Sequence, residues 1–255
     1  MQLGGRQLSK VAGALLRREH YVAFAGMWEV YDHPLEMLRR YLTHQGSYPF
    51  QAGLKTPMGH TDVTLYTFHD VLTVNEIFCR QDYRVPRTVS RVVDFGSNIG
   101  LSALYFLTRN EHCRVRLYEP VPENIEKLKL TLKDYEARYV LEPIAVGLSD
   151  GDVEFGTEPS GRYGGIGKAT GHSVRVPCRR ADAVLSEILA EKDFGDIDLL
   201  KVDIEGLEAG LVASLSPGVL ERVRAIDAEI EGMAPDLPGF KRDRYGPIVR
   251  WRRAG

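Results

Sequence analysis

A short segment with two glycines and a carboxylate stands near the middle of the chain. It reads Val92-Val93-Asp94-Phe95-Gly96-Ser97-Asn98-Ile99-Gly100, so an apolar strand runs into a turn and then into a helix. Glycines allow a tight turn close to a ligand, and the first N–H groups of a helix bind polar groups. The Asp-x-Gly-x-x-x-Gly spacing is not GxGxxG, and a carboxylate beside the turn repels a pyrophosphate. The pattern favours the cationic cofactor S-adenosylmethionine over NAD, with a purely structural turn as the alternative.

A second carboxylate follows the next expected strand. Glu119 comes after Val115-Arg116-Leu117-Tyr118 and precedes Pro120. It lies about 20 residues beyond the glycine segment, where an acid accepts hydrogen bonds from the ribose hydroxyls of a nucleotide. A surface glutamate at a strand end is the alternative.

A third acidic group lies in Leu200-Lys201-Val202-Asp203-Ile204-Glu205-Gly206-Leu207-Glu208. Asp203 follows an apolar strand, and ligands of open α/β sheets bind outside the carboxyl ends of the strands. Asp203 is therefore expected beside Gly96 and Glu119, as a catalytic base or a ligand of Mg²⁺. Glu208 is expected to stabilise the start of the next helix.

A fourth set of acids alternates with apolar residues in Asp227-Ala228-Glu229-Ile230-Glu231, so all of them lie on one face of a strand. Buried carboxylates need partners. Two interpretations stay open: Asp203 and Glu229 bind Mg²⁺, or the acids pair with arginine or lysine. Among the histidines, His172 is the best candidate for a catalytic base because it follows the glycine-rich stretch 161–171.

The elements that position these residues alternate between strand and helix. Strands are expected at 92–95, 115–118, 139–146, 197–202 and 223–230, and helices at 101–107, 124–135, 183–189 and 207–215. This alternation predicts an α/β fold with a mostly parallel, Rossmann-like sheet and helices on both faces. Residues 1–86 are expected to form an extension, helical to about residue 45 and then a turn at 55–59 with a strand, that serves as acceptor lid or dimer contact. Pro86 marks the boundary before a cofactor-binding domain at 87–255.

Composition limits the class of function. Hydrophobic residues make up 44% of the 255, charged residues 27%, and the net charge is −2, so nucleic acid is not an expected partner. The basic residues between 241 and 253 are expected to form a solvated tail. No membrane span or signal peptide is expected, and three separated cysteines indicate a cytoplasmic setting.

Together these motifs resemble the FkbM family of methyltransferases over roughly residues 54–231. The resemblance rests on the glycine segment, on Glu119-Pro120-Val121-Pro122-Glu123-Asn124, on Ala145-Val146-Gly147, and above all on Leu200-Lys201-Val202-Asp203 with Glu205-Gly206. It implies a class I methyltransferase that transfers a methyl group from S-adenosylmethionine to a hydroxyl of a sugar or polyketide-type natural product. The residues that it places around the cofactor are Tyr83, Asp94, Gly96, Ser97, Asn98, Gly100, Ser102, Glu119, Pro120, Ala145, Val146 and Asp203.

One departure from the family concerns the end of the sheet. Only about 24 residues follow the fifth strand, and they are expected to supply one strand at most, near 248–252. The N-terminal segment or a second subunit would then complete the edge, so a homodimer is one expectation. Two other functions stay open: a nicotinamide-dependent oxidoreductase, and a non-catalytic cofactor-binding protein on the same fold.

Overall fold

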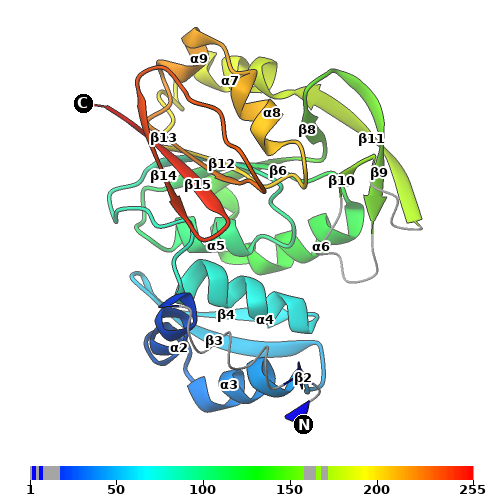
Figure 1. The fold of residues 1–255 in the computed structure, drawn as a ribbon, viewed down its shortest axis with the longest axis vertical. Coiled ribbons are helices and arrows are strands. Elements are labelled where there is room, and N and C mark those ends of the chain that lie inside the picture. Colours follow the sequence, from blue (N-terminus) through cyan, green and yellow to red (C-terminus); the bar gives the residue numbers. More distant parts are fainter. Residues whose placement is uncertain (1, 4–5, 8–17, 158–164, 168–171, 255) are drawn as a thin grey trace. The chain divides into compact units, whose positions relative to one another are not determined.

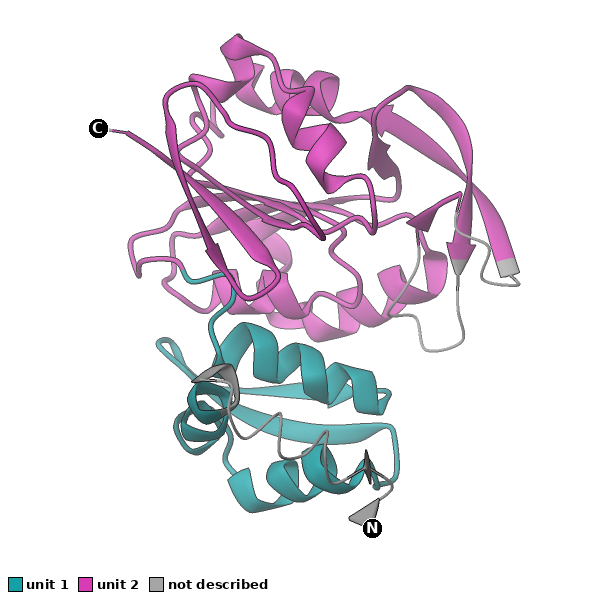
Figure 2. Ribbon diagram, in the orientation of Figure 1, with its two compact units in different colours: residues 1–84 teal, residues 85–255 magenta. Residues whose placement is uncertain are grey.

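A computed structural model of the chain describes residues 2–3, 6–7, 18–157, 165–167 and 172–254. They divide into two compact units, residues 1–84 and 85–255 (Figure 2). This boundary lies within two residues of the expected one at Pro86.

The first unit combines helices with a β-hairpin. Its elements are β1 (Gln2–Leu3), β2 (Arg6–Gln7), α2 (Arg18–Val30), α3 (Pro34–Thr43), β3 (Phe50–Thr56), β4 (Gly59–Leu65), α4 (Phe68–Val74) and the π-helical η1 (Asn75–Cys79). The hairpin turn falls at 57–58, as the sequence predicts. The expectation of helix throughout residues 1–45 is wrong for β1 and β2, which pair with each other. Residues 8–17 lie outside the described part.

The second unit is built on a seven-stranded sheet. Its strands are β5 (Arg91–Phe95), β6 (Arg114–Tyr118), β7 (Tyr139–Glu142), β12 (Leu199–Val202), β13 (Ala225–Glu229), β14 (Phe240–Tyr245) and β15 (Ile248–Arg253). Their order is β14-β15-β13-β12-β5-β6-β7. The pairs among β7, β6, β5, β12 and β13 are parallel, and β15 is antiparallel to both of its neighbours. The predicted α/β fold with a mostly parallel sheet is confirmed.

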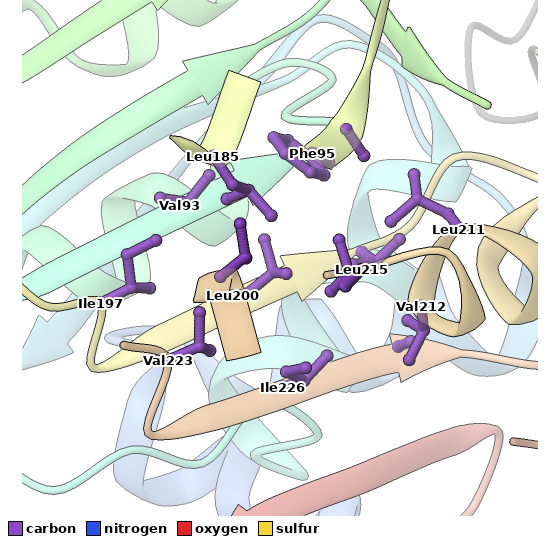
Figure 3. Packing of buried hydrophobic residues seen from close by; sticks show 14 of the residues in the cluster. Val93, Phe95, Leu185, Ile197, Leu200, Leu211, Val212, Leu215, Val223 and Ile226 are labelled. Atoms are coloured by element: carbon purple, nitrogen blue, oxygen red, sulfur yellow. The ribbon is translucent and has the colours of Figure 1, made fainter. Parts of the chain in front are cut away.

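Helices cover both faces of this sheet, as Figure 1 shows. They are α5 (Leu101–Leu107) and α6 (Pro122–Thr131) with the short 3-10 segment η2 (Lys133–Arg138), and α7 (Ala181–Ala190), α8 (Glu208–Ala213) and α9 (Pro217–Leu220). Strands covered on both sides are mostly apolar, which explains why the residues of β5 and β12 are apolar apart from Arg91, Asp94 and Lys201. The main core lies on the face with α7, α8 and α9, where Val93, Phe95, Leu200, Ile226 and Val212 pack together (Figure 3).

The predicted third strand is divided between two sheets. The expected strand 139–146 is two strands: β7 belongs to the main sheet, and β8 (Ala145–Gly147) belongs to a four-stranded sheet. Pro143 separates them, and proline has no N–H to donate to a ladder. The other strands of this sheet are β9 (Gly151–Thr157), β10 (Gly165–Ile166) and β11 (His172–Arg180), and they were not expected from the sequence.

The C-terminal hairpin corrects two expectations. The sheet gains two strands after β13, not one, because β14 and β15 pair across the turn at Gly246. The basic residues expected as a solvated tail lie in this hairpin, and Arg252 forms an ion pair with the buried Asp227. An unfinished edge therefore no longer argues for a homodimer.

A row of charged residues crosses the sheet on the face opposite the main core. Asp94, Lys201, Asp227, Arg250 and Asp243 stand in register on β5, β12, β13, β15 and β14. Paired residues of neighbouring strands project to the same face, so charges of alternating sign follow one another across five strands. We call this set the charge row. Its first three members are buried.

Candidate active site

The glycine loop (residues 96–100) connects β5 to α5 and is fixed to the neighbouring strand. Gly96 and Gly100 have φ angles of +80° and +85°, a region that favours glycine. The N–H groups of Gly96 and Ser97 both donate to the Tyr118 carbonyl at 3.1 Å. The Ser97 hydroxyl donates to the Asp94 carbonyl at 2.9 Å. Backbone bonds to β6 therefore set the shape of the loop.

Gly96 also lies against the segment that follows β12. A Cβ atom at Gly96 would stand 1.8 Å from the Asp203 carbonyl oxygen, and the Asp203 N–H donates to the Phe95 carbonyl at 3.1 Å. No side chain fits between these two backbones. The structure thus brings Gly96 and Asp203 together, as the sequence predicts.

Glu119 is buried beside the same loop and accepts hydrogen bonds from it. Its Oε2 atom accepts from the Asn98 N–H at 2.8 Å, and its Oε1 atom accepts from the Val121 N–H at 3.0 Å and the Asn124 amide at 3.2 Å. Burial raises the pKa of Glu119 to about 6, although these hydrogen bonds oppose the shift. A carboxylate has about four acceptor positions, so Oε2 can accept a further donor.

Asp94 lies inside the site and pairs with Lys201, a partner that was not expected from the sequence. Its side chain is fully buried. One carboxylate oxygen lies 2.9 Å from Lys201 Nζ, and the other accepts a 2.5 Å hydrogen bond from the Ser102 hydroxyl. Asp94 and Ser102 are therefore internal parts of the site, and their contact with the cofactor stays a prediction.

Lys201 is a site residue whose role was not expected from the sequence. It is buried, and Nζ donates to the Gly96 carbonyl at 3.1 Å and lies 3.5 Å from Asp203 Oδ2. Burial opposes its charge, but Asp94 and Asp203 outweigh this effect and raise the pKa of Lys201 above its ordinary value. The signal was present in the sequence: a single lysine interrupts an otherwise apolar strand.

The segment after β12 is held by its own carboxylate. Glu208 is buried and accepts hydrogen bonds from the Ile204 N–H at 3.1 Å and the Gly206 N–H at 2.9 Å. Glu205 and Gly206 adopt φ angles of +61° and +101° in this turn. The structural role expected for Glu208 is confirmed. The side chain of Asp203 keeps 30% of its surface exposed, so it can meet a ligand.

Four other predicted cofactor or catalytic residues lie outside this hydrogen-bonded group. Pro120 is buried directly after Glu119, and Ala145 and Val146 are buried in β8 of the smaller sheet. Tyr83 is buried in the first unit. Their predicted contacts with the cofactor stay predictions. A fifth residue, His172, begins β11, but its side chain lies outside the described part, as does most of the stretch 161–171.

The predicted Mg²⁺ site gains no support. Asp227 is occupied by Arg252, so pairing with arginine is the correct interpretation for this acid. Glu229 is exposed at the end of β13. Among the residues that the structure describes, no three His, Cys, Asp or Glu side chains gather in a way that could hold a metal ion. Nor does any helix within those residues have the length and hydrophobicity of a membrane span.

Comparison with protein families identifies the domain. Residues 94–236, more than half of the chain, match the methyltransferase FkbM domain. The chain belongs to the FkbM methyltransferase family. The match begins at Asp94 and includes Glu119, Lys201 and Asp203, so the FkbM domain contains the hydrogen-bonded site just described. The resemblance seen in the sequence is confirmed.

Two curated relatives match this chain at low identity. The methyltransferase sdnD of Sordaria araneosa is 26% identical over 215 residues, covering 69% of this chain and 82% of sdnD. The AMB antimetabolite synthetase AmbE of Pseudomonas aeruginosa is 25% identical over 243 residues. That match covers 76% of this chain but only 11% of AmbE.

Solved structures of methyltransferases are similar to the FkbM chain at a lower level. One from Geobacter sulfurreducens has a TM-score of 0.37 at 14% identity, covering 66% of this chain and 72% of the other. TrmK of M. capricolum, in complex with S-adenosyl-homocysteine, has a TM-score of 0.37 at 8% identity, covering 68% and 66%. The family assignment rests on the FkbM match and not on these scores.

Proposed function

We propose that this FkbM protein is an S-adenosylmethionine-dependent methyltransferase that methylates a hydroxyl oxygen of a small molecule. One observation carries the proposal. The carboxyl ends of β5, β6 and β12 are tied into one group, because the glycine loop binds Glu119 through Asn98 and touches Asp203 through Gly96. This group lies where the strand order of the sheet reverses, between β5 and β12, the usual place for a ligand in open α/β sheets.

The donor and acceptor groups present suit this cofactor. Glu119 Oε2 accepts one hydrogen bond from the protein, so it keeps a lone pair for a hydroxyl donor such as a ribose. Glu119 and Asp203 bring negative charge, while Asp94 is compensated by Lys201. A cationic sulfonium ligand suits such surroundings better than a pyrophosphate does.

Methyl transfer requires mainly alignment, which is the contribution of these residues. Bound S-adenosylmethionine supplies a methyl carbon whose bond to sulfur breaks as its bond to the acceptor oxygen forms, with the electron pair going to sulfur. In the proposal Glu119 holds the ribose, and the glycine loop holds the methionine portion. The partly exposed carboxylate of Asp203 accepts the hydroxyl proton.

The acceptor class is supported by charge and by relatives. A net charge of −2 does not suit a nucleic-acid substrate. The relatives are a methyltransferase and an antimetabolite synthetase. We therefore place the acceptor among hydroxylated small molecules such as sugars or polyketide-type natural products.

Calorimetric titration tests the cofactor. S-Adenosylhomocysteine and NAD⁺ are titrated separately into the full chain, each with and without Mg²⁺. Micromolar binding of S-adenosylhomocysteine alone supports the proposal, and weak binding by Glu119→Gln beside normal binding by the exposed Glu123→Gln locates the ribose contact. Binding of NAD⁺ alone, or of neither compound, overturns it.

A screen of hydroxylated acceptors then tests turnover. Product is detected by mass as a gain of one methyl group on oxygen, with Asp203→Asn as the comparison variant. Transfer to oxygen that depends on Asp203 supports the assigned role. Methylation on nitrogen or carbon refutes the proposed acceptor group while leaving the cofactor assignment standing.

A further inference from the structure

Lys201 stands where three parts of the site meet. Its Nζ atom lies 2.9 Å from Asp94 Oδ1 on β5, 3.1 Å from the Gly96 carbonyl oxygen in the glycine loop, and 3.5 Å from Asp203 Oδ2 after β12. The side chain of Lys201 is 2% exposed and that of Asp94 is not exposed. The Lys201 ammonium group thus links Asp203, the more exposed of its two carboxylate partners, to the buried Asp94.

A buried ammonium is costly, and neutralisation of Asp94 does not explain all of its contacts. An ion pair with Asp94 would balance the charge of that carboxylate by itself. Lys201 also binds a backbone carbonyl and approaches a second carboxylate. Both partners belong to residues whose backbones approach closely, because a Cβ at Gly96 would lie 1.8 Å from the Asp203 backbone carbonyl oxygen.

The contact with Gly96 fixes one peptide group from both sides. The Gly96 N–H is bound to the Tyr118 carbonyl, and the Gly96 carbonyl is bound to Lys201. With both ends held, the following residues leave the sheet in a set direction, and the Asn98 N–H reaches Glu119. Loss of the ammonium would release the carbonyl side of this peptide group.

We propose that Lys201 is a positioning residue that holds the glycine loop and the Asp203 carboxylate in the arrangement that binds the cofactor. The inference rests on the proposed function for its ligand, since it concerns the same site. It assigns to Lys201 more than the role of counter-ion to Asp94. Three variants separate the two roles.

The variants are Asp94→Asn, Lys201→Met and the double variant that carries both. Lys201→Met alone leaves the Asp94 carboxylate buried without its ammonium, so a marked loss of thermal stability is expected. The double variant removes both charges, and asparagine can keep a hydrogen bond with Ser102. Its melting temperature is therefore expected close to that of Asp94→Asn. Lys129→Met, an exposed lysine on α6, is the matched control.

Affinity for S-adenosylhomocysteine is the first measurement. If Lys201 positions the loop, the double variant binds at least about tenfold more weakly than Asp94→Asn, the scale of one lost charge-assisted hydrogen bond. Lys129→Met binds like the unaltered chain. Equal affinity of the double variant and Asp94→Asn, within about twofold, overturns the inference, because a counter-ion role ends when Asp94 loses its charge.

Hydrogen exchange measured without ligand keeps the inference testable if the proposed cofactor is wrong. Amides of residues 96–98 and 203–206 are expected to exchange faster in the double variant than in Asp94→Asn, while those of α7 stay unchanged. Unchanged exchange at the loop and at 203–206 overturns the positioning role. Failure of the unaltered chain to bind S-adenosylhomocysteine refutes the proposed function and leaves this exchange result to decide the role of Lys201.

Discussion

Replacement of Gly96 by alanine is the sharpest test of how the site is assembled. The added Cβ would lie 1.8 Å from the Asp203 carbonyl oxygen and 2.9 Å from its carbonyl carbon. Ordinary van der Waals contact begins at 3.4 Å, so the two backbones must separate by more than an ångström. The φ angle of +80° adds strain that only glycine avoids. Separation would also break the bond from Lys201 to the Gly96 carbonyl.

The expected cost follows from these two effects. A left-handed conformation costs a residue with a side chain about 1–2 kcal/mol, and overpacking costs about 1–3 kcal/mol, so Gly96→Ala should lower the free energy of unfolding by about 2–5 kcal/mol. Gly218→Ala on α9 is the control, because its Cβ would meet no atom within 4 Å. That variant should be neutral or slightly stabilising.

Tryptophan fluorescence can report on the second unit alone. The chain has two tryptophans. Trp251 is fully buried in the core of the second unit, whereas Trp28 is 43% exposed on α2. Urea unfolding is therefore followed in a Trp28→Phe background, and affinity for S-adenosylhomocysteine is measured in parallel. A Gly96→Ala protein that matches the Gly218→Ala control in both stability and affinity would refute the close contact between these loops.

Three further predictions concern Glu119, the buried ion pair and the C-terminal hairpin. Burial raises the pKa of Glu119 from 4.5 to about 6, so this residue should add about 2 kcal/mol to the free energy of unfolding below pH 4.5. That contribution should be lost as the pH rises through 6. Thermal melts of Glu119→Gln should lack this pH dependence, and affinity for S-adenosylhomocysteine should rise over the same interval only in the unaltered chain. Arg252→Met should destabilise the protein by about 3 kcal/mol because Asp227 stays buried and unpaired, and adding Asp227→Asn should recover most of the loss in urea melts. A chain ending at residue 236 loses β14, β15 and Trp251, so calorimetry should show no cooperative transition for its second unit, whereas retention of that transition would contradict the role given to the hairpin.

Much of the sheet could be predicted because burial on both faces produces a simple pattern. Strands β5 and β12 consist mainly of apolar residues, and each has a turn directly after it. Parallel strands bring their carboxyl ends to one edge, so Gly96, Glu119 and Asp203 could be placed together from topology alone.

The pairing of Asp94 with Lys201 could not be predicted in the same way. The two residues lie on neighbouring strands that are far apart in the sequence, and only the register of β5 with β12 brings them together. Without the register, Asp94 looked available to a cationic ligand. A lone lysine within an apolar strand was the sign that it had a buried partner.

The C-terminal hairpin was missed because its charges resembled those of a solvated tail. Four consecutive exposed charged residues of β14, Lys241 to Arg244, are also what an outer strand can carry. The better signal was the Gly246-Pro247 turn followed by Ile248, Val249 and Trp251, which are all buried. Turn chemistry beside an apolar run predicts a hairpin more reliably than net charge does.

The charge row helps to determine which strand register the sheet adopts. Val92 and Val93, like Leu199 and Leu200, are nearly interchangeable in hydrophobicity, so apolar contacts alone discriminate weakly against a slip of one residue between β5 and β12. Such a slip would turn Lys201 toward the face packed by α7 and set a leucine against Asp94. Each misplaced charge would be buried without a partner, at a cost of several kcal/mol. We therefore expect the charge row to disfavour misregistered strands during folding. Replacing Asp94 and Lys201 together should broaden the unfolding transition even where its midpoint is unchanged.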